Sequence, residues 1–313
     1  MAHAVIVFLI VLAALIIVVP FAIEARRKVM DAQDRQNAPG TFVELSQGIT
    51  HYQWHGPVRG PIAVCVHGLT TPSFVWQGLA TGLSAMGYRV LTYDLYGRGY
   101  SDRPAGAQTD AFFVQQLEEL LNDQEVTEDF TLIGYSMGGA ISTCFAAKHP
   151  DLVRLLVLLA PAGMSMTTGR LAQIIRRTPL VGDWLMMAFF PARHQKEVEA
   201  ERDLPTSVLD ITDLQLRELE YQGFTSAVLS SLRGILGREL KDEHQAIHRA
   251  GVPVLAVWGR NDAVIPLSAM GKLTEWSRST RQEVIADAGH GLTYTHTDEV
   301  LEILGERLNE GLN

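Results

Sequence analysis

The sequence contains few cysteines and no cluster of them. Cys65 lies in an apolar run and Cys144 in a helix-like stretch, so we expect both to be buried free thiols. Two cysteines exclude a disulfide framework, and no spacing typical of a metal site surrounds them. Nothing in the sequence indicates a metal, nucleotide or other cofactor.

The chain also lacks a surplus of positive charge, internal repeats and low-complexity tracts. Its formal net charge is −9, which argues against nucleic acid as the main partner and leaves a small neutral substrate open. Apolar residues make up 47% of the 313 positions, enough for a sizeable core. This length fits one large α/β domain with an inserted subdomain, or two smaller domains.

Charge is missing altogether from residues 4–23, which form an apolar run close to the N-terminus. As a helix this run would extend roughly 30 Å, about the thickness of the hydrocarbon core of a bilayer. We therefore predict a transmembrane signal-anchor helix over residues 1–23 and a juxtamembrane linker over residues 24–41. A cleaved signal peptide of a secreted protein and a buried core helix are the alternatives.

A secretory signal peptide would have basic residues before the apolar run. Here the nearby basic residues follow the run. They are Arg26, Arg27 and Lys28. Since a basic flank tends to remain in the cytoplasm, we expect a single-pass membrane protein with its main domain on the cytoplasmic side.

Short apolar runs that resemble buried strands alternate with helical stretches along most of the chain. The clearest runs cover residues 62–66, 88–93, 130–133, 155–159 and 254–258. This alternation predicts an α/β fold with a mostly parallel sheet covered on both faces, over residues 42–163 and 251–313. Between them, residues 164–250 show helical patterns only, which predicts a helical cap inserted between two strands.

A serine between two glycines follows the run at 130–133, in Gly134-Tyr135-Ser136-Met137-Gly138. A sharp turn from strand to helix would present the hydroxyl of Ser136 clear of the sheet, and side chains two positions away would collide. This context predicts a nucleophile elbow, whereas an ordinary glycine-rich turn is the alternative.

A serine nucleophile needs a base, and the base needs a partner that orients it. His290 follows the last strand-like run, and Asp262 follows the run at 254–258. We therefore predict a catalytic set of Ser136, Asp262 and His290, in the chain order expected on a strand–helix sheet. For the oxyanion we predict two backbone N–H donors, from Leu69 and from Met137.

Five motifs occur in the same order along the chain as in a known protein family. They are His67-Gly68-Leu69, the turn from Asp94 to Ser101, the segment from Gly134 to Gly139, Gly259-x-x-Asp262-x-x-x-Pro266 and Gly289-His290. Over residues 42–310 the chain resembles a serine-dependent member of the α/β-hydrolase fold family. The resemblance implies an acyl-enzyme mechanism on Ser136, a structural role for Asp94, and a packing role for His67. Haloalkane dehalogenases and epoxide hydrolases carry aspartate at the elbow, so Ser136 counts against both.

The anchor and an apolar stretch at residues 184–191 point to a lipid-like substrate, although this stretch could equally be packing. The layout resembles that of membrane-anchored monoacylglycerol lipases, which implies hydrolysis of monoacylglycerol or medium-chain acyl esters. Carbon–carbon bond hydrolysis and perhydrolysis use the same three residues and remain open. The former would need basic cap residues, for which Arg176, Arg177 or Arg193 are candidates. A membrane-tethered ligand sensor is the non-enzymatic alternative.

The other histidines are expected at the surface. They are His194, His244, His248 and His296. Of these, only His296 lies close enough in the sequence to His290 to stand in for it as the base.

Overall fold

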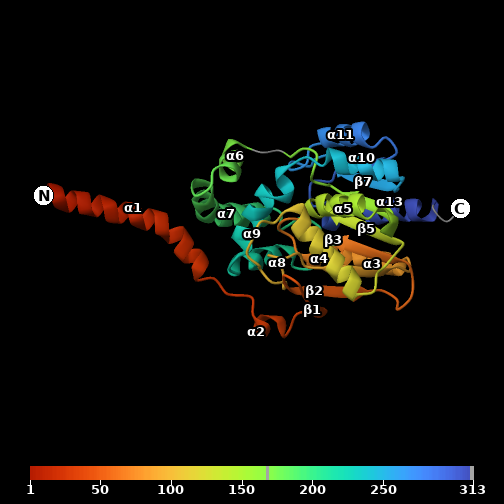
Figure 1. The fold of residues 1–313 in the computed structure, drawn as a ribbon, viewed down its shortest axis with the longest axis horizontal. Coiled ribbons are helices and arrows are strands. Elements are labelled where there is room, and N and C mark those ends of the chain that lie inside the picture. Colours follow the sequence, from red (N-terminus) through yellow and green to blue (C-terminus); the bar gives the residue numbers. More distant parts are fainter. Residues whose placement is uncertain (167–168, 311–313) are drawn as a thin grey trace.

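A computed structural model describes residues 1–166 and 169–310 (Figure 1). Residues 167 and 168, in the predicted cap, and residues 311–313, in the predicted core, lie outside the described residues.

The centre of the structure is an eight-stranded sheet with the order β1-β2-β4-β3-β5-β6-β7-β8. The strands are β1 (Thr41–Leu45), β2 (Gly48–His55), β3 (Ile62–Val66), β4 (Arg89–Tyr93), β5 (Phe130–Tyr135), β6 (Val153–Leu159), β7 (Val254–Gly259) and β8 (Arg281–Ile285). The β1–β2 and β2–β4 pairs are antiparallel and all other pairs are parallel. The predicted α/β fold with a mostly parallel sheet is thus confirmed.

The central strands are apolar on both sides because helices cover both faces of the sheet. In β3, Val64 and Val66 join the core on one face, and Ala63 and Cys65 join the core on the other. Both faces exclude water, so successive residues of such a strand can all be apolar.

The helices that cover the two faces come from different parts of the chain. Side chains of α4 (Asp110–Asp123), α5 (Met137–Lys148), α10 (Lys241–Ala250) and α11 (Ser268–Trp276) pack on one face. Those of α3 (Gln77–Ala85), α12 (Leu292–Thr295) and α13 (Thr297–Glu310) pack on the other. Two short 3₁₀ segments, η1 (Ser73–Trp76) and η2 (Pro150–Leu152), lead into α3 and β6.

Between β6 and β7 the chain forms helices and no described strand. They are α6 (Arg170–Arg177), α7 (Val181–Glu199), α8 (Ile211–Arg217), η3 (Glu218–Glu220), α9 (Phe224–Arg233), η4 (Ile235–Gly237) and α10. Met186, Phe224, Val228 and Leu229 form a small core of their own among α7 and α9. We refer to residues 170–250 as the helical insert. Its standing as a separate cap with the boundaries 164–250 remains a prediction.

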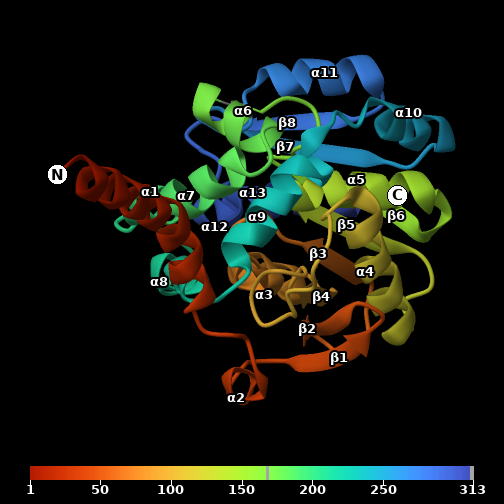
Figure 2. The same cartoon turned by 60° about the vertical axis from the view of Figure 1, so that its left-hand side comes forward.

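The N-terminal helix α1 (Ala2–Ala25) reaches away from the sheet (Figures 1 and 2). It has no buried residue and is long and apolar enough to cross a membrane, a test that signal sequences also pass. Its first half projects freely in Figure 1, but its second half packs against α7, where the Trp184 indole donates a 3.0 Å hydrogen bond to the Ile16 carbonyl.

The base of α1 and the linker behind it are attached to the helical insert. Glu24 accepts a 2.8 Å hydrogen bond from the Gly223 amide, and Arg27 donates to Thr225. Lys28 forms an ion pair of 2.8 Å with Glu220. The linker also contains a short helix, α2 (Ala32–Arg35). Two of the three basic residues after the apolar run therefore interact with protein groups.

Candidate active site

Ser136 lies between β5 and α5 with the backbone angles φ +53° and ψ −116°. A positive φ is costly for a residue with a side chain, and it persists only where the surroundings impose it. A Cβ atom on Gly138 would clash with the Val66 carbonyl, and one on Gly134 would clash with the Gly138 carbonyl. Glycine is thus required at both flanking positions, and the tight turn aims the serine away from the sheet.

The structure brings Ser136, His290 and Asp262 together from the ends of three different strands. The Oγ of Ser136 lies 3.0 Å from Nε2 of His290, and Nδ1 of His290 lies 2.8 Å from Oδ2 of Asp262. The other carboxylate oxygen of Asp262 accepts 2.8 Å hydrogen bonds from the amides of Val264 and Ile265. Since an ionised carboxylate only accepts, His290 carries its proton on Nδ1, which leaves Nε2 to accept the serine proton.

The three side chains differ in their exposure to the cavity. The Asp262 side chain is 1% exposed and that of His290 is 23% exposed. The buried carboxylate is thus shielded from water, whereas the imidazole is open to a substrate on the Ser136 side. This arrangement can activate a hydroxyl nucleophile and then pass its proton on.

Leu69, whose amide is a predicted oxyanion donor, follows β3 and lines the same cavity as Ser136. Met137, the other predicted donor, is the first residue of α5, where backbone N–H groups have no partner within the helix. Among the described hydrogen bonds, none is donated by either amide. Both donors remain predictions.

His67 lies beneath this turn and is completely buried. Its Nε2 accepts from the Leu95 amide at 2.9 Å, so its Nδ1 carries the proton and donates to the Gly68 carbonyl at 2.8 Å. Burial lowers the pKa of His67 to about 4. His67 is therefore neutral, and both its ring nitrogens are used in hydrogen bonds to the backbone. This agrees with the packing role expected for it.

Arg98 is a buried residue that the sequence analysis did not single out. Its Nε donates to the Leu69 carbonyl at 3.0 Å, and its Nη1 donates to Gln108 and to the Tyr96 carbonyl. Its Nη2 donates to Ser231 at 2.8 Å, in α9 of the insert. One guanidinium group thus joins the turn that carries Leu69 to the helical insert.

The cavity beside Ser136 has a volume of about 280 Å³. The insert contributes Phe190, His194 and two glutamates, Glu197 and Glu201, to its wall. No lysine or arginine is among the described residues that line it. Arg176, Arg177 and Arg193, proposed as carboxylate-binding residues, therefore lie elsewhere: Arg176 donates to the Leu236 carbonyl, and Arg193 pairs with Glu197.

Two histidines expected at the surface are buried, and for these the prediction was wrong. His194 is 6% exposed and stacks on Phe190 at 5.2 Å between ring centroids, and His244 is 1% exposed. Burial lowers the pKa of both, that of His244 to about 4. Their helices turn these positions inward, which a lone histidine in a sequence does not reveal. His248 is exposed and His296 is half-buried.

The described residues contain one group with metal-ligand atoms close together, formed by Asp110, Cys144 and Glu243. Arg238 donates to both carboxylates, at 2.7 Å and 2.6 Å, and lies 3.8 Å from the Cys144 sulfur. Burial raises the pKa of Cys144 to about 12, so its thiol stays protonated. The Arg238 guanidinium already neutralises the two carboxylates of this cluster, so the cluster is a poor metal site.

Comparison with known proteins gives a consistent result. The profile of the alpha/beta hydrolase fold matches residues 61–297. A 2-hydroxymuconate semialdehyde hydrolase from Pseudomonas sp. (strain CF600) is 28% identical over 288 residues, which covers 88% of this chain and 96% of the relative.

Solved structures share the fold at lower identity. An esterase from Exiguobacterium antarcticum superposes with a TM-score of 0.72 at 20% identity, covering 86% of this chain and 99% of the esterase. A structure described as a membrane phospholipase A has a TM-score of 0.71 at 20% identity, and the match covers 100% of this chain and 98% of the other, the N-terminal helix included.

Proposed function

Because the chain belongs to the α/β-hydrolase fold family, we propose that it is a serine carboxylic-ester hydrolase that acts on lipid-like esters. Monoacylglycerol and medium-chain acyl esters are the substrates we expect. The observation that carries the proposal is the continuous hydrogen-bond chain from Ser136 through His290 to Asp262. Relatives and fold neighbours that are named hydrolases and esterases support hydrolase chemistry in general.

In the first half of the reaction, Ser136 attacks the ester carbonyl while Nε2 of His290 takes its proton. Asp262 stabilises the imidazolium through Nδ1, and the amides of Leu69 and Met137 donate to the oxyanion. The C–O bond to the alcohol then breaks, and His290 passes its proton to the leaving oxygen. The product is an acyl group on Ser136 and a free alcohol.

In the second half, His290 removes a proton from water, and the water oxygen attacks the acyl carbon. The bond to Ser136 breaks, His290 returns the proton to Oγ, and the acid leaves. No described residue other than these is needed to balance the protons.

The charge of the cavity favours a neutral substrate. Glu197 is paired with Arg193, but Glu201 lines the cavity with no ion-pair partner among the described residues, and no lysine or arginine is in the described wall, so a substrate carboxylate would meet like charge. At about 30 Å³ per water-sized group, the cavity has room for roughly nine such groups, which suits a short or medium acyl chain.

A membrane setting is supported by the contact between α1 and the insert. Ile16, to which Trp184 is bonded, lies about ten residues before Arg26, so it is roughly 15 Å further along the helix. If α1 spans a membrane, the start of the insert reaches the hydrocarbon region beside it. The exposed apolar side chains there, the apolar tip, are Leu171, Ile174, Leu180, Val181 and Phe189. A substrate dissolved in lipid would then be close to Phe190 at the cavity wall.

Carbon–carbon bond hydrolysis is the second candidate, because the Pseudomonas relative is named a 2-hydroxymuconate semialdehyde hydrolase and a fold neighbour is named a meta-cleavage product hydrolase. The acidic wall of the cavity counts against an anionic substrate of that kind.

Hydrolysis of p-nitrophenyl esters from acetate to palmitate, and of a monoacylglycerol, tests the proposal. Full-length protein in detergent micelles is compared with the Ser136→Ala variant. Activity that peaks at medium chains and disappears in the variant supports the proposal. Folded protein that reacts with a fluorophosphonate at Ser136 but turns over no ester would favour the ligand sensor.

A further inference from the structure

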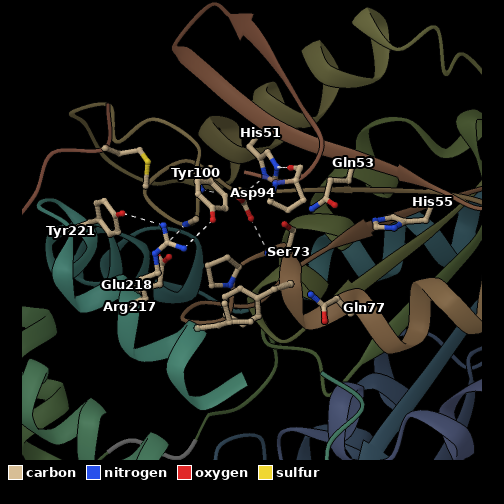
Figure 3. A pocket seen from close by; sticks show the side chains of 16 residues that line it. His51, Gln53, His55, Ser73, Gln77, Asp94, Tyr100, Arg217, Glu218 and Tyr221 are labelled. Carbon is tan, nitrogen blue, oxygen red and sulfur yellow. Dashed lines mark hydrogen bonds and ion pairs between the residues drawn. The ribbon is translucent and has the colours of Figure 1, made fainter. Parts of the chain in front are cut away.

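A second cavity of about 230 Å³ lies behind the active site, where the linker, the core and the helical insert meet (Figure 3). Two pieces of chain separate it from the first cavity. Thr71 and Gln215 face the active site, whereas their neighbours Pro72 and Leu214 face the second cavity. Met30 and Pro39 of the linker complete its wall. None of the residues proposed for catalysis lines it.

The feature that distinguishes this cavity is Arg217. Its guanidinium lies between two tyrosines and donates to the Tyr100 hydroxyl at 3.0 Å and to the Tyr221 hydroxyl at 3.3 Å (Figure 3). No ion pair in the described part of the chain includes Arg217. A guanidinium has five N–H donors, so several remain for a ligand. The Tyr100 hydroxyl accepts from Arg217 and keeps its own proton to donate.

The carboxylates around the cavity have partners of their own. Asp94 accepts from the amides of Ser73 and Tyr100, at 2.8 Å and 2.9 Å, and from Nδ1 of His51 at 2.8 Å. The buried contact between these two groups raises the pKa of His51, against the effect of burial, and lowers the pKa of Asp94.

Glu218 accepts from the Gly99 amide at 3.0 Å and lies 3.7 Å from Arg103. Asp34, outside the cavity, is reached only through the Tyr221 hydroxyl, which donates to it at 3.0 Å. Asp94 and Glu218 thus each have a positively charged partner. Arg217, in contrast, forms no ion pair with any described residue.

The rest of the wall suggests the form of the ligand. Pro72, Phe74 and Leu214 give the cavity an apolar middle. On the side opposite Arg217, Figure 3 shows Gln53, His55 and Gln77. A ligand with an anionic head, a short apolar stem and a polar far end would satisfy all three parts.

We propose that this second cavity binds a small organic oxyanion, a carboxylate or a phosphate, whose charged oxygens are held by the Arg217 guanidinium and the Tyr100 hydroxyl. A planar guanidinium recognises such groups through paired N–H donors. At about 30 Å³ per water-sized group, the ligand has roughly eight non-hydrogen atoms.

Such a ligand would act on the active site through the wall that the two cavities share. The ligand would contact Pro72 and Phe74 and restrict their movement. These residues follow the turn that carries Leu69. The bound anion would also tie the linker to the insert, since Met30 and Arg217 line the same space. We therefore expect occupancy to change the reactivity of Ser136 without any contact with it.

The test uses full-length protein in neutral detergent and four probes: succinate, glycerol 3-phosphate, inorganic phosphate and uncharged glycerol. Binding is measured by calorimetry and by the shift in melting temperature, and the reactivity of Ser136 by its rate of labelling with a fluorophosphonate. Labelling needs Ser136 activated by His290 but no ester turnover, so the test stands apart from the question of which ester is hydrolysed. Arg217→Gln is compared with Arg249→Gln, which removes an exposed arginine of α10 outside both cavities.

We expect an organic anion to bind wild type and Arg249→Gln equally, and to bind Arg217→Gln at least tenfold more weakly. Tyr100→Phe should weaken binding less, because it removes one neutral donor. The labelling rate should respond to the anion in wild type and not in Arg217→Gln. The proposal is overturned if no anion binds folded wild-type protein, if glycerol binds as well as the anions, or if Arg217→Gln binds as tightly as wild type.

Discussion

In the α/β core, the central strands β5 and β7 are buried from end to end, and the residues that follow the carboxyl ends of β5, β7 and β8 converge on one point. In the helical insert, α6 has no buried residue, and both α6 and α7 expose large apolar side chains, although α7 packs against α1. The first region is constrained by its own packing. The second leaves apolar surface uncovered, which monomeric soluble proteins rarely do over a large contiguous patch.

If the proposed function is right, this contrast assigns the chemistry to one part of the chain and the choice of substrate to another. Ser136, Asp262 and His290 all come from the core, whereas Phe190, His194 and the two glutamates of the cavity wall come from the insert. Changes in the core should therefore alter the reaction with every ester, and changes in the insert should alter which ester is preferred.

The largest effect should come from Ser136→Ala, which removes the nucleophile. We expect kcat to fall by about 10⁵-fold or more for short and long esters alike. The matched control is Ser142→Ala, a buried serine of α5 six residues after Ser136. It should keep kcat within about threefold. Substantial esterase activity in purified Ser136→Ala would contradict the assignment.

Asp262→Asn should lower kcat by about 10⁴-fold, because an amide at this position favours the wrong tautomer of His290. Asp287→Asn, an exposed residue of the loop before His290, is the control and should be neutral. Steady-state kinetics across pH 6 to 9 measure both. A loss below tenfold in Asp262→Asn would mean that another group orients the histidine.

Arg98→Lys tests the junction between core and insert. Arg98 contacts Leu69, Gln108 and Ser231 from three different nitrogens, whereas lysine carries all its N–H donors on one nitrogen. It cannot reach all three partners, so the turn that carries the Leu69 amide should shift. We expect kcat to fall about ten- to hundredfold, part of the effect of losing an oxyanion donor, with KM nearly unchanged. Melting curves and KM for two chain lengths are the readouts. A change in KM alone would assign Arg98 to substrate binding instead of positioning.

A double substitution in the apolar tip, Leu180→Asp with Val181→Asp, should separate the two regions by substrate. Both side chains are exposed, at 81% and 58%, so the fold should be retained. We expect hydrolysis of vesicle-borne monoacylglycerol to fall about tenfold and hydrolysis of soluble p-nitrophenyl acetate to stay within twofold. Equal effects on both substrates would argue against lipid contact at the tip.

The smallest effect concerns stability at the junction of α10 with the core. His244 is buried, and neither ring nitrogen has a described partner. Its folded pKa of about 4 lies below the unfolded value of about 6.5, so the unfolded state binds more protons and stability falls as the pH drops from 6.5 towards 4. From pH 7 to pH 5 the loss is about 2 kcal/mol.

His244→Leu should remove this dependence, and His248→Leu, on the exposed side of the same helix, should not. Urea unfolding at pH 7 and pH 5 measures the difference. Identical pH dependence in wild type and His244→Leu would contradict the role of this histidine.

The same contrast explains what could be predicted from the sequence. The ends of parallel strands meet at one edge of a sheet, so the positions of Ser136, Asp262 and His290 followed from motif order and strand order. The insert has no such rule, because the face that a helix buries depends on its neighbours. His194 was therefore assigned to the surface, and Arg176 and Arg193 were considered for a cavity that they do not line. The roles of Arg98 and Arg217 depend on partners far away in the sequence, such as Ser231 and Tyr100.

The most direct test of the account is to trap the acyl-enzyme. Full-length protein is mixed with p-nitrophenyl octanoate, quenched in acid within milliseconds, digested and analysed by mass spectrometry. The account predicts an octanoyl group on the peptide that contains Ser136 in wild-type protein, and none on that peptide in Ser136→Ala. Turnover of the ester by wild-type protein with no acyl group on Ser136, or with the acyl group on another residue, would contradict it.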